Sequence, residues 1–200
     1  MRASRAARVA TPICALALLC LLAATGLGRA QAPARGWTAT EGDVRVTCRL
    51  TVGGSFEART TALTGTLTSG PTSSVLVGDM SVDLTTLDTG IGLRNQHLRE
   101  NYLEVQKAGF ETAVLSAIDV GVLAPDVAEG SRPFTARLRL HGTTQPVAGR
   151  VTFRRRGSVL RLEATFPVQI AAYGIPDPRY LGVGVRNEVT VRVSFDASPS

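Results

Sequence analysis

The sequence is poor in the residues from which reactive sites are usually built. Its 200 residues include three cysteines and two histidines, His97 and His141. Two of the cysteines, Cys14 and Cys20, fall within the first thirty residues, so Cys48 stands alone in the remainder. A lone cysteine excludes an intramolecular disulfide. Zinc and copper sites usually need about three or four ligands gathered around one point. We therefore expect no metal or other cofactor, and we interpret Cys48 as a buried small hydrophobe.

The chain also has little excess of positive over negative charge once the N-terminal thirty residues are set aside. Four arginines and no acidic residue lie there, which leaves 18 basic and 16 acidic residues and a net charge of +2. The one basic run, Arg154–Arg156, lies beside Gly157 and is typical of a solvated hairpin turn. Nucleic-acid binding would need a clustered basic face with aromatic platforms. We therefore expect no nucleic-acid partner.

Long hydrophobic runs are absent as well. The apolar stretch over 13–22 is shorter than the roughly 20 residues that span a bilayer. It follows an arginine-rich start and precedes small residues up to Ala30 or Ala34, which is the order of parts in a secretory signal peptide. We expect residues 1–30 to be this leader, with no membrane span after cleavage and a periplasmic or secreted protein. An uncleaved anchor is the alternative, and a lipoprotein site at Cys20 is disfavoured because that residue lies inside the apolar run.

What the sequence does contain is alternation of apolar and polar residues. From Val44 to Val52 every second residue is apolar and the others are charged or Thr, which indicates a strand with one dry face. Glycine- and proline-rich turns separate such segments. We predict about eight strands and an all-β fold, either a sandwich or an up-and-down antiparallel barrel. The strands are expected at residues 43–52, 63–68, 74–84, 113–120, 134–140, 147–153, 159–166 and 188–195.

Two segments interrupt this rhythm. Residues 92–105 place apolar side chains at helical spacing, and we predict a short helix there, with Thr89 as its cap, lying across an open end of the barrel. Residues 172–184 hold two prolines and three glycines, and we predict a long loop at a rim. Residues 31–40 are expected to form a flexible linker.

The chain lacks the usual catalytic motifs, namely a GxSxG elbow, a P-loop and HExxH. Its densest polar group runs from Arg94 to Glu100. Two interpretations stay open: a lid whose Arg94 and His97 meet the polar head of a ligand, or a helix whose Arg and His side chains tie its ends to strand backbones. His141 begins a turn, and a hydrogen-bonded turn histidine is favoured over a functional one.

The inward faces carry mainly Val, Leu and Ala, and the whole chain holds six Phe, three Tyr and one Trp. A barrel of about eight strands either fills with its own side chains or keeps a cavity for one ligand. With so few large side chains we expect a cavity, which would favour an apolar ligand at about 0.8 kcal/mol per buried methylene. A narrow, self-filled barrel is the alternative.

Four segments together resemble the YceI-like family of lipid- and polyisoprenoid-binding proteins. Two lie around the predicted helix: LDTG with RNQHLR at 87–90 and 94–99, and YLEV with GFETA at 102–105 and 109–113. The others are LRLHGTTQPV at 138–147 and AYGI with NEVTV at 172–175 and 187–191. Asn95 stands where the family usually has Asp, and the segment from Trp37 to Leu50 departs from the family's opening motif.

The resemblance implies a lipocalin-like barrel over residues 41–197, export, and an isoprenoid or other long lipid in the cavity. Our leading hypothesis is a carrier that makes and breaks no bond, as a monomer or homodimer. A self-filled module that binds another exported protein is second, and an enzyme using His97 with Arg94 is last, since no nucleophile or paired carboxylate accompanies them. The expected ligand-binding residues are Arg94, His97, Leu98, Tyr102, Leu138, Leu140, Leu162, Phe166, Val191 and Val193.

Overall fold

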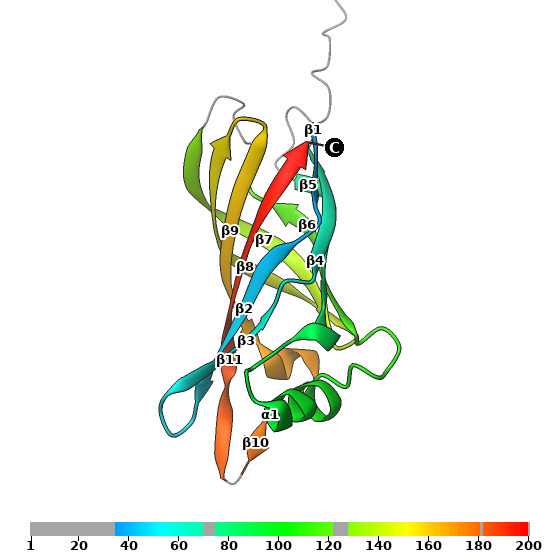
Figure 1. Ribbon diagram of the computed structural model, residues 1–200, viewed down its shortest axis with the longest axis vertical. Coiled ribbons are helices and arrows are strands. Elements are labelled where there is room, and N and C mark those ends of the chain that lie inside the picture. Colours follow the sequence, from blue (N-terminus) through cyan, green and yellow to red (C-terminus); the bar gives the residue numbers. More distant parts are fainter. Residues whose placement is uncertain (1–34, 70–74, 122–127, 181, 200) are drawn as a thin grey trace, which may run out of the picture. The chain divides into compact units, whose positions relative to one another are not determined.

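The computed structural model describes residues 35–69, 75–121, 128–180 and 182–199. The leader predicted for residues 1–30 lies outside the described residues. The described part is a single antiparallel sheet of eleven strands that curls into a barrel (Figure 1). The strands are β1 (Arg35–Ala39), β2 (Gly42–Leu50), β3 (Ser55–Thr60), β4 (Leu63–Ser69), β5 (Val75–Asp83), β6 (Thr112–Asp119), β7 (Glu129–Leu140), β8 (Thr143–Arg156), β9 (Val159–Gln169), β10 (Arg179–Tyr180) and β11 (Val183–Pro199).

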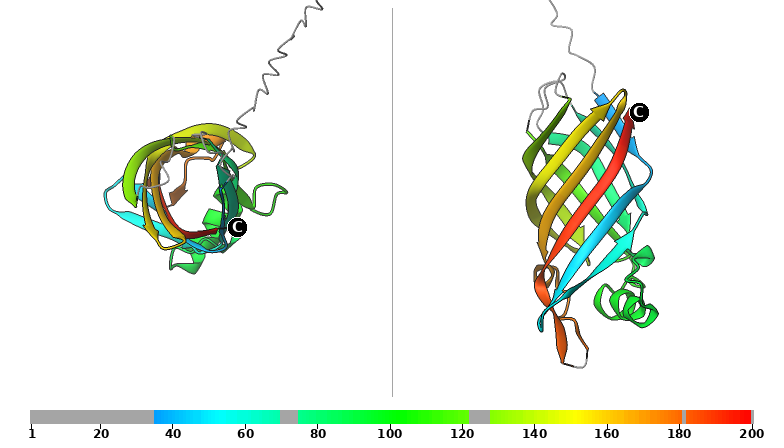
Figure 2. Two further views of the ribbon diagram at one scale, coloured as in Figure 1. Left: turned by 90° about the horizontal axis from the view of Figure 1, so that it is seen from above. Right: turned by 60° about the vertical axis from the view of Figure 1, so that its left-hand side comes forward.

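The barrel is closed by β1, which pairs with β4 on one side and with β11 on the other. The pairing of β1 with β4 keeps the register that pairs β2 with β3. Strands β1 and β2 therefore act as one interrupted wall strand, and β3 and β4 act as the next. With β5, β6, β7, β8, β9 and β11 they make eight wall strands in chain order, seen as a ring in Figure 2. The predicted lipocalin-like up-and-down barrel is confirmed.

The prediction of a flexible linker over residues 31–40 is wrong for its second half, because Arg35–Ala39 form β1. The segment is too short to show alternation, and it is ordered by pairing on both edges. Ala39 is buried, and Trp37 packs against the core. Strand β3 was likewise missing from the predicted set. Its six residues continue the wall strand of β4 toward the opposite end of the barrel.

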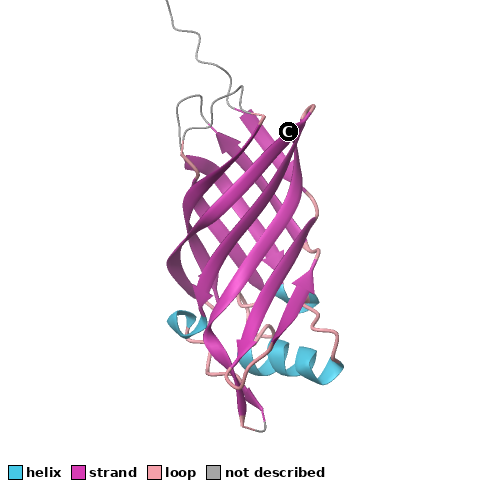
Figure 3. Cartoon of the chain, turned by 90° about the vertical axis from the view of Figure 1, so that its left-hand side faces the viewer, coloured by secondary structure: helices cyan, strands magenta, loops and turns pink. Residues whose placement is uncertain are grey.

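Helical segments gather at one end of the barrel (Figure 3). They are the 3₁₀ helices η1 (Leu84–Thr86) and η3 (Ile170–Tyr173), and α1 (Gly92–Gln96), which continues as the π-helical turn η2 (His97–Tyr102). The predicted helix over 92–105 is therefore present and lies at the mouth, but its N-cap is Ile91 rather than Thr89. The predicted rim loop over 172–184 contains the short β10–β11 hairpin.

The alternation predicted from sequence is what the strands show. In β7, for example, Phe134, Ala136 and Leu138 are buried while the residues between them are exposed. Val52 is the exception, because β2 ends at Leu50 and leaves Val52 in a turn, 70% exposed. The inward side chains of all eight wall strands form a continuous apolar lining.

A glycine permits a close approach of two wall strands at β5. Gly78 has φ +122°, and a Cβ built there would lie 2.0 Å from the backbone oxygen of Thr66 on β4. The register between β5 and β6 shifts at this place, between Leu76 and Met80, as expected at a β-bulge. The irregularity bends the strand, and such bends help a sheet to close into a barrel.

Candidate functional site: an apolar cavity with a polar mouth

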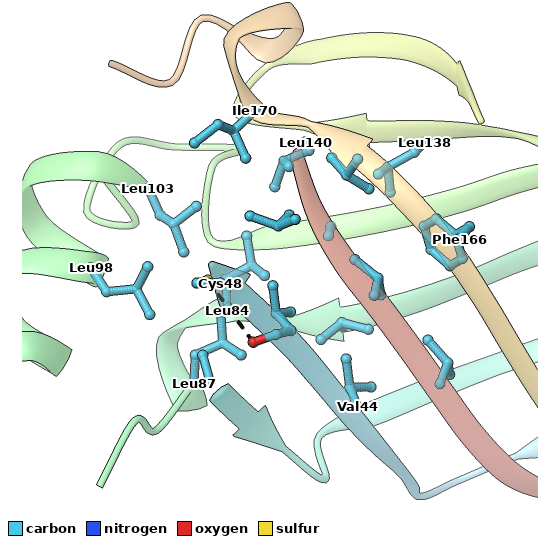
Figure 4. Close-up of a pocket in the computed structure, with 18 of the residues that line it drawn as sticks. Val44, Cys48, Leu84, Leu87, Leu98, Leu103, Leu138, Leu140, Phe166 and Ile170 are labelled. Atoms are coloured by element: carbon cyan, nitrogen blue, oxygen red, sulfur yellow. Dashed lines mark hydrogen bonds between the residues drawn. The ribbon is translucent and has the colours of Figure 1, made fainter. Parts of the chain in front are cut away.

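The barrel encloses a cavity of about 610 Å³. Pockets that hold small molecules measure roughly 300–1,000 Å³, so the space is large enough for a ligand. Its walls come from inward residues of β2 to β9 and β11, together with residues of η1, α1, η2, η3 and β10. The close-up in Figure 4 shows Leu98 and Leu103 from the helical segment pointing into the same space as Leu138, Leu140 and Phe166 from the wall. The self-filled alternative is therefore wrong.

The cavity is elongated along the strands. On β11 its lining includes every second residue from Val189 to Phe195, and on β9 every second residue from Leu162 to Val168. Six residue steps cover about 20 Å at roughly 3.3 Å per residue. A second, smaller void of about 30 Å³ lies beyond it, beside Trp37 and Phe153. The space is shaped for a chain-like molecule that lies along the barrel.

Polar groups line this cavity at one end. Of its lining residues, those with charged or hydrogen-bonding side chains other than the thiol of Cys48 are Arg94, His97, Tyr102 and Arg179. All four belong to α1, η2 or β10, the elements that surround the mouth in Figure 1. No Asp or Glu is among the lining residues. The cavity thus has an apolar body and a mouth rich in donors and positive charge.

Two hydrogen-bonded contacts hold the helical segment over the mouth. The Tyr102 hydroxyl donates to the backbone oxygen of Arg179 at 3.0 Å and accepts from its N–H at 3.1 Å. The Arg99 guanidinium donates to the backbone oxygen of Leu87 through Nε at 3.1 Å and Nη2 at 2.5 Å. These two contacts tether η2 to β10 and to the backbone that follows η1.

Arg94 differs from these tethers. Its guanidinium lies over the ring of Phe56, 4.4 Å from the centroid, which is within the range of a cation–π contact. Phe56 on β3 is the cross-strand partner of Cys48 on β2, and both line the cavity. Burial raises the pKa of the Cys48 thiol to about 12, and the nearby charge of Arg94 opposes that rise. Cys48 is thus a protonated wall residue, as predicted.

His141 is held by hydrogen bonds in the turn between β7 and β8, where it has φ +50°. Its Nδ1–H donates to the backbone oxygen of Tyr173 at 3.0 Å, and its Nε2 lies 3.0 Å from Oε2 of Glu104. Glu104 also pairs with Lys107, and this hydrogen bond first, then the one to His141, holds the pKa of Glu104 below its ordinary value. The cluster joins the segment after η2 to the barrel, which agrees with the turn-histidine interpretation.

The side chain of Asn95, which stands where the family usually has Asp, forms hydrogen bonds with the loop before α1. Its side-chain oxygen accepts from the N–H and hydroxyl of Thr89, at 2.7 and 2.6 Å. Its amide nitrogen donates to Asp88 at 2.6 Å, and this hydrogen bond is the main reason why the pKa of Asp88 is lowered. Asn95 therefore stabilises the loop before α1, and it is not among the residues that line the cavity.

All ten residues that the sequence analysis selects as ligand-binding lie in the cavity lining. Six come from the wall strands and four from α1 and η2, so the fold brings together positions up to about a hundred residues apart. That they contact a ligand stays a prediction. Sequence reasoning missed Phe56 because β3 was not predicted, and it missed Arg179 because the rim loop gave no sign of which residue faces inward.

The part of the chain that the structure describes contains no group of three or more His, Cys, Asp or Glu side chains placed to share a metal ion. None of its helices is long and apolar enough to cross a membrane. The cavity itself holds no carboxylate that could serve as a base beside His97 and Arg94.

Comparison with solved structures shows the same fold. A polyisoprenoid-binding domain from Saccharophagus degradans, implicated in plant cell wall breakdown, matches with a TM-score of 0.63 and 16% identity, over 82% of this chain and 98% of that one. Burkholderia cenocepacia BcnA matches with a TM-score of 0.59 and 15% identity, over 78% and 96%. The Campylobacter jejuni YCEI protein matches with a TM-score of 0.52 and 9% identity, over 69% and 81%.

No curated protein matches the sequence. The model of the YceI-like domain does, over residues 37–197. This range begins in β1 and ends in β11, so it includes residues of every strand of the barrel and all the residues that line the cavity. Sequence, fold and cavity agree, and the chain belongs to the YceI-like domain family.

Proposed function

We propose that the protein is an exported carrier that sequesters a polyisoprenoid or another long apolar ligand in its barrel and catalyses no reaction on it. The observation that carries the proposal is the elongated cavity of about 610 Å³, whose walls are apolar along the strands. Transfer of each ligand methylene from water into such a space contributes about 0.8 kcal/mol. A chain of about ten carbons would therefore gain about 8 kcal/mol, which is comparable to the cost of association.

Two further observations support this proposal. The Saccharophagus degradans neighbour is described as a polyisoprenoid-binding domain, and its shared fold makes a ligand of similar shape reasonable here. The sequence of residues 1–30 has the parts of a secretory signal peptide, which favours a carrier that works in the periplasm or outside the cell.

Organic extraction of the protein purified from its own host, followed by mass spectrometry, tests the proposal. We expect one dominant class of long-chain lipid in near-stoichiometric amount. The matched controls use neighbouring residues on opposite faces of β9. Ala164→Phe places a ring in the cavity, and Glu163→Phe places the same ring on the exposed face. Lipid recovered with wild type and Glu163→Phe and lost with Ala164→Phe would support binding in the barrel. Wild-type protein that yields no lipid and binds no long-chain probe would refute it.

A further inference from the structure

The mouth of the cavity carries an uncompensated positive group. Among the described residues Arg94 has no carboxylate within ion-pair distance, whereas Arg179 is paired with Asp177 at 2.6 Å. The Tyr102 hydroxyl is already engaged on both its donor and acceptor sides by Arg179. Of the two arginines at the mouth, Arg94 is thus the one whose charge is not paired with a carboxylate.

The contact of Arg94 with Phe56 also holds the guanidinium at the cavity lining. A guanidinium is planar and carries its five N–H groups around its edge. When one face lies on an aromatic ring, the edge stays available for bidentate contact with two anionic oxygens. Phe56 and Arg94 both line the cavity, and Arg94 belongs to α1 at the mouth, so its donors lie near the place where the chain of a bound ligand would leave the apolar body.

We propose that the ligand is an anionic amphiphile: a long apolar chain in the barrel that ends in a phosphate or carboxylate bound by Arg94 at the mouth. This inference rests on the proposed function and narrows it. The lining contains no acidic residue, so an anionic head meets no repulsion there. A neutral head would leave a half-buried cation beside apolar walls without a counter-charge, and charge pairs are stronger in such surroundings than in water.

Competition between matched ligands tests this inference. The delipidated protein is loaded with the neutral fluorescent probe N-phenyl-1-naphthylamine. The probe is then displaced by dodecyl phosphate below its critical micelle concentration or by dodecanol below its solubility limit. The two competitors share a chain and differ in the head group. We expect dodecyl phosphate to bind about tenfold more tightly, as a charge-assisted hydrogen-bonded pair predicts. The advantage should shrink at high salt, because exposed parts of the pair are screened.

The variant Arg94→Gln should abolish that advantage, because it should weaken the binding of dodecyl phosphate far more than the binding of dodecanol. Arg192→Gln is the matched control, because Arg192 is exposed on the outer face of β11 and absent from the cavity lining. It should keep the full preference. Arg94→Lys retains the charge without the bidentate fork and should keep part of it; it also serves if the glutamine variant does not fold.

The outcomes separate the two proposals. Equal binding of both competitors to wild type, or a preference that survives in Arg94→Gln, would overturn the anionic head group at Arg94 and leave the carrier function standing. Failure of the probe and both competitors to bind at all would instead refute the carrier function. A preference lost equally in Arg94→Gln and Arg192→Gln would show that net charge, not this site, selects the head.

Discussion

Filling the cavity should make the protein more stable and less able to bind. Ala164 lies on β9 between Val151 on β8 and Val193 on β11, and it faces the void. An apolar cavity of about 150 Å³ accepts a benzene ring, so a space of about 610 Å³ has room for the phenyl group of Ala164→Phe. Burial of that ring in a void should raise the free energy of unfolding by about 1.5–3 kcal/mol.

The same ring should obstruct a long ligand. If it displaces about two to four methylenes, each worth about 0.8 kcal/mol, affinity should fall by roughly 15- to 200-fold. The assay pairs urea unfolding of the delipidated protein with displacement of N-phenyl-1-naphthylamine. Glu163→Phe is the control, since an exposed substitution should change stability by less than about 0.5 kcal/mol and leave binding intact.

A higher free energy of unfolding together with a lower ligand affinity would indicate an empty cavity that binds the ligand. A barrel packed solid at this level would instead be overpacked by the phenyl group and lose about 1–3 kcal/mol. A less stable Ala164→Phe protein, or a more stable one that binds the probe as well as wild type does, would refute the reasoning.

Three further predictions concern the framework. Gly78→Ala should lower the free energy of unfolding in urea by at least about 2 kcal/mol, since φ +122° and the Thr66 oxygen leave no place for a Cβ; an unchanged midpoint would contradict this. The stability that Glu104 provides over Glu104→Gln should be present above pH 4.5 and disappear as pH falls through the lowered pKa of Glu104; a melting-temperature difference that persists in acid would count against its hydrogen bonds. Cys48, buried and with a pKa near 12, should resist a thiol reagent at neutral pH until urea unfolds the barrel, and rapid labelling of native protein would disprove its wall position.

The fold was largely predictable because a strand with one solvent-exposed face shows alternating apolar and polar residues in its sequence. Alternation in segments such as Phe134–Leu140 fixes both the strand and the inward side, and the scarcity of large aromatics indicated a cavity. Strands β1 and β3 escaped prediction for a physical reason. Each is short, and β1 is ordered by pairing with β4 and β11, which are contacts that no local pattern records.

The sequence by itself determined which side chains face inward and that few of them are large, whereas the cavity itself is a property of the tertiary structure. Only the tertiary structure decided how the mouth is built, because that depends on segments distant in the chain. It placed Arg94 over Phe56, tied Tyr102 to Arg179 and joined His141 to Glu104. Period-two patterns encode the face of a strand, whereas contacts between loops depend on where barrel closure brings them, and that information is non-local.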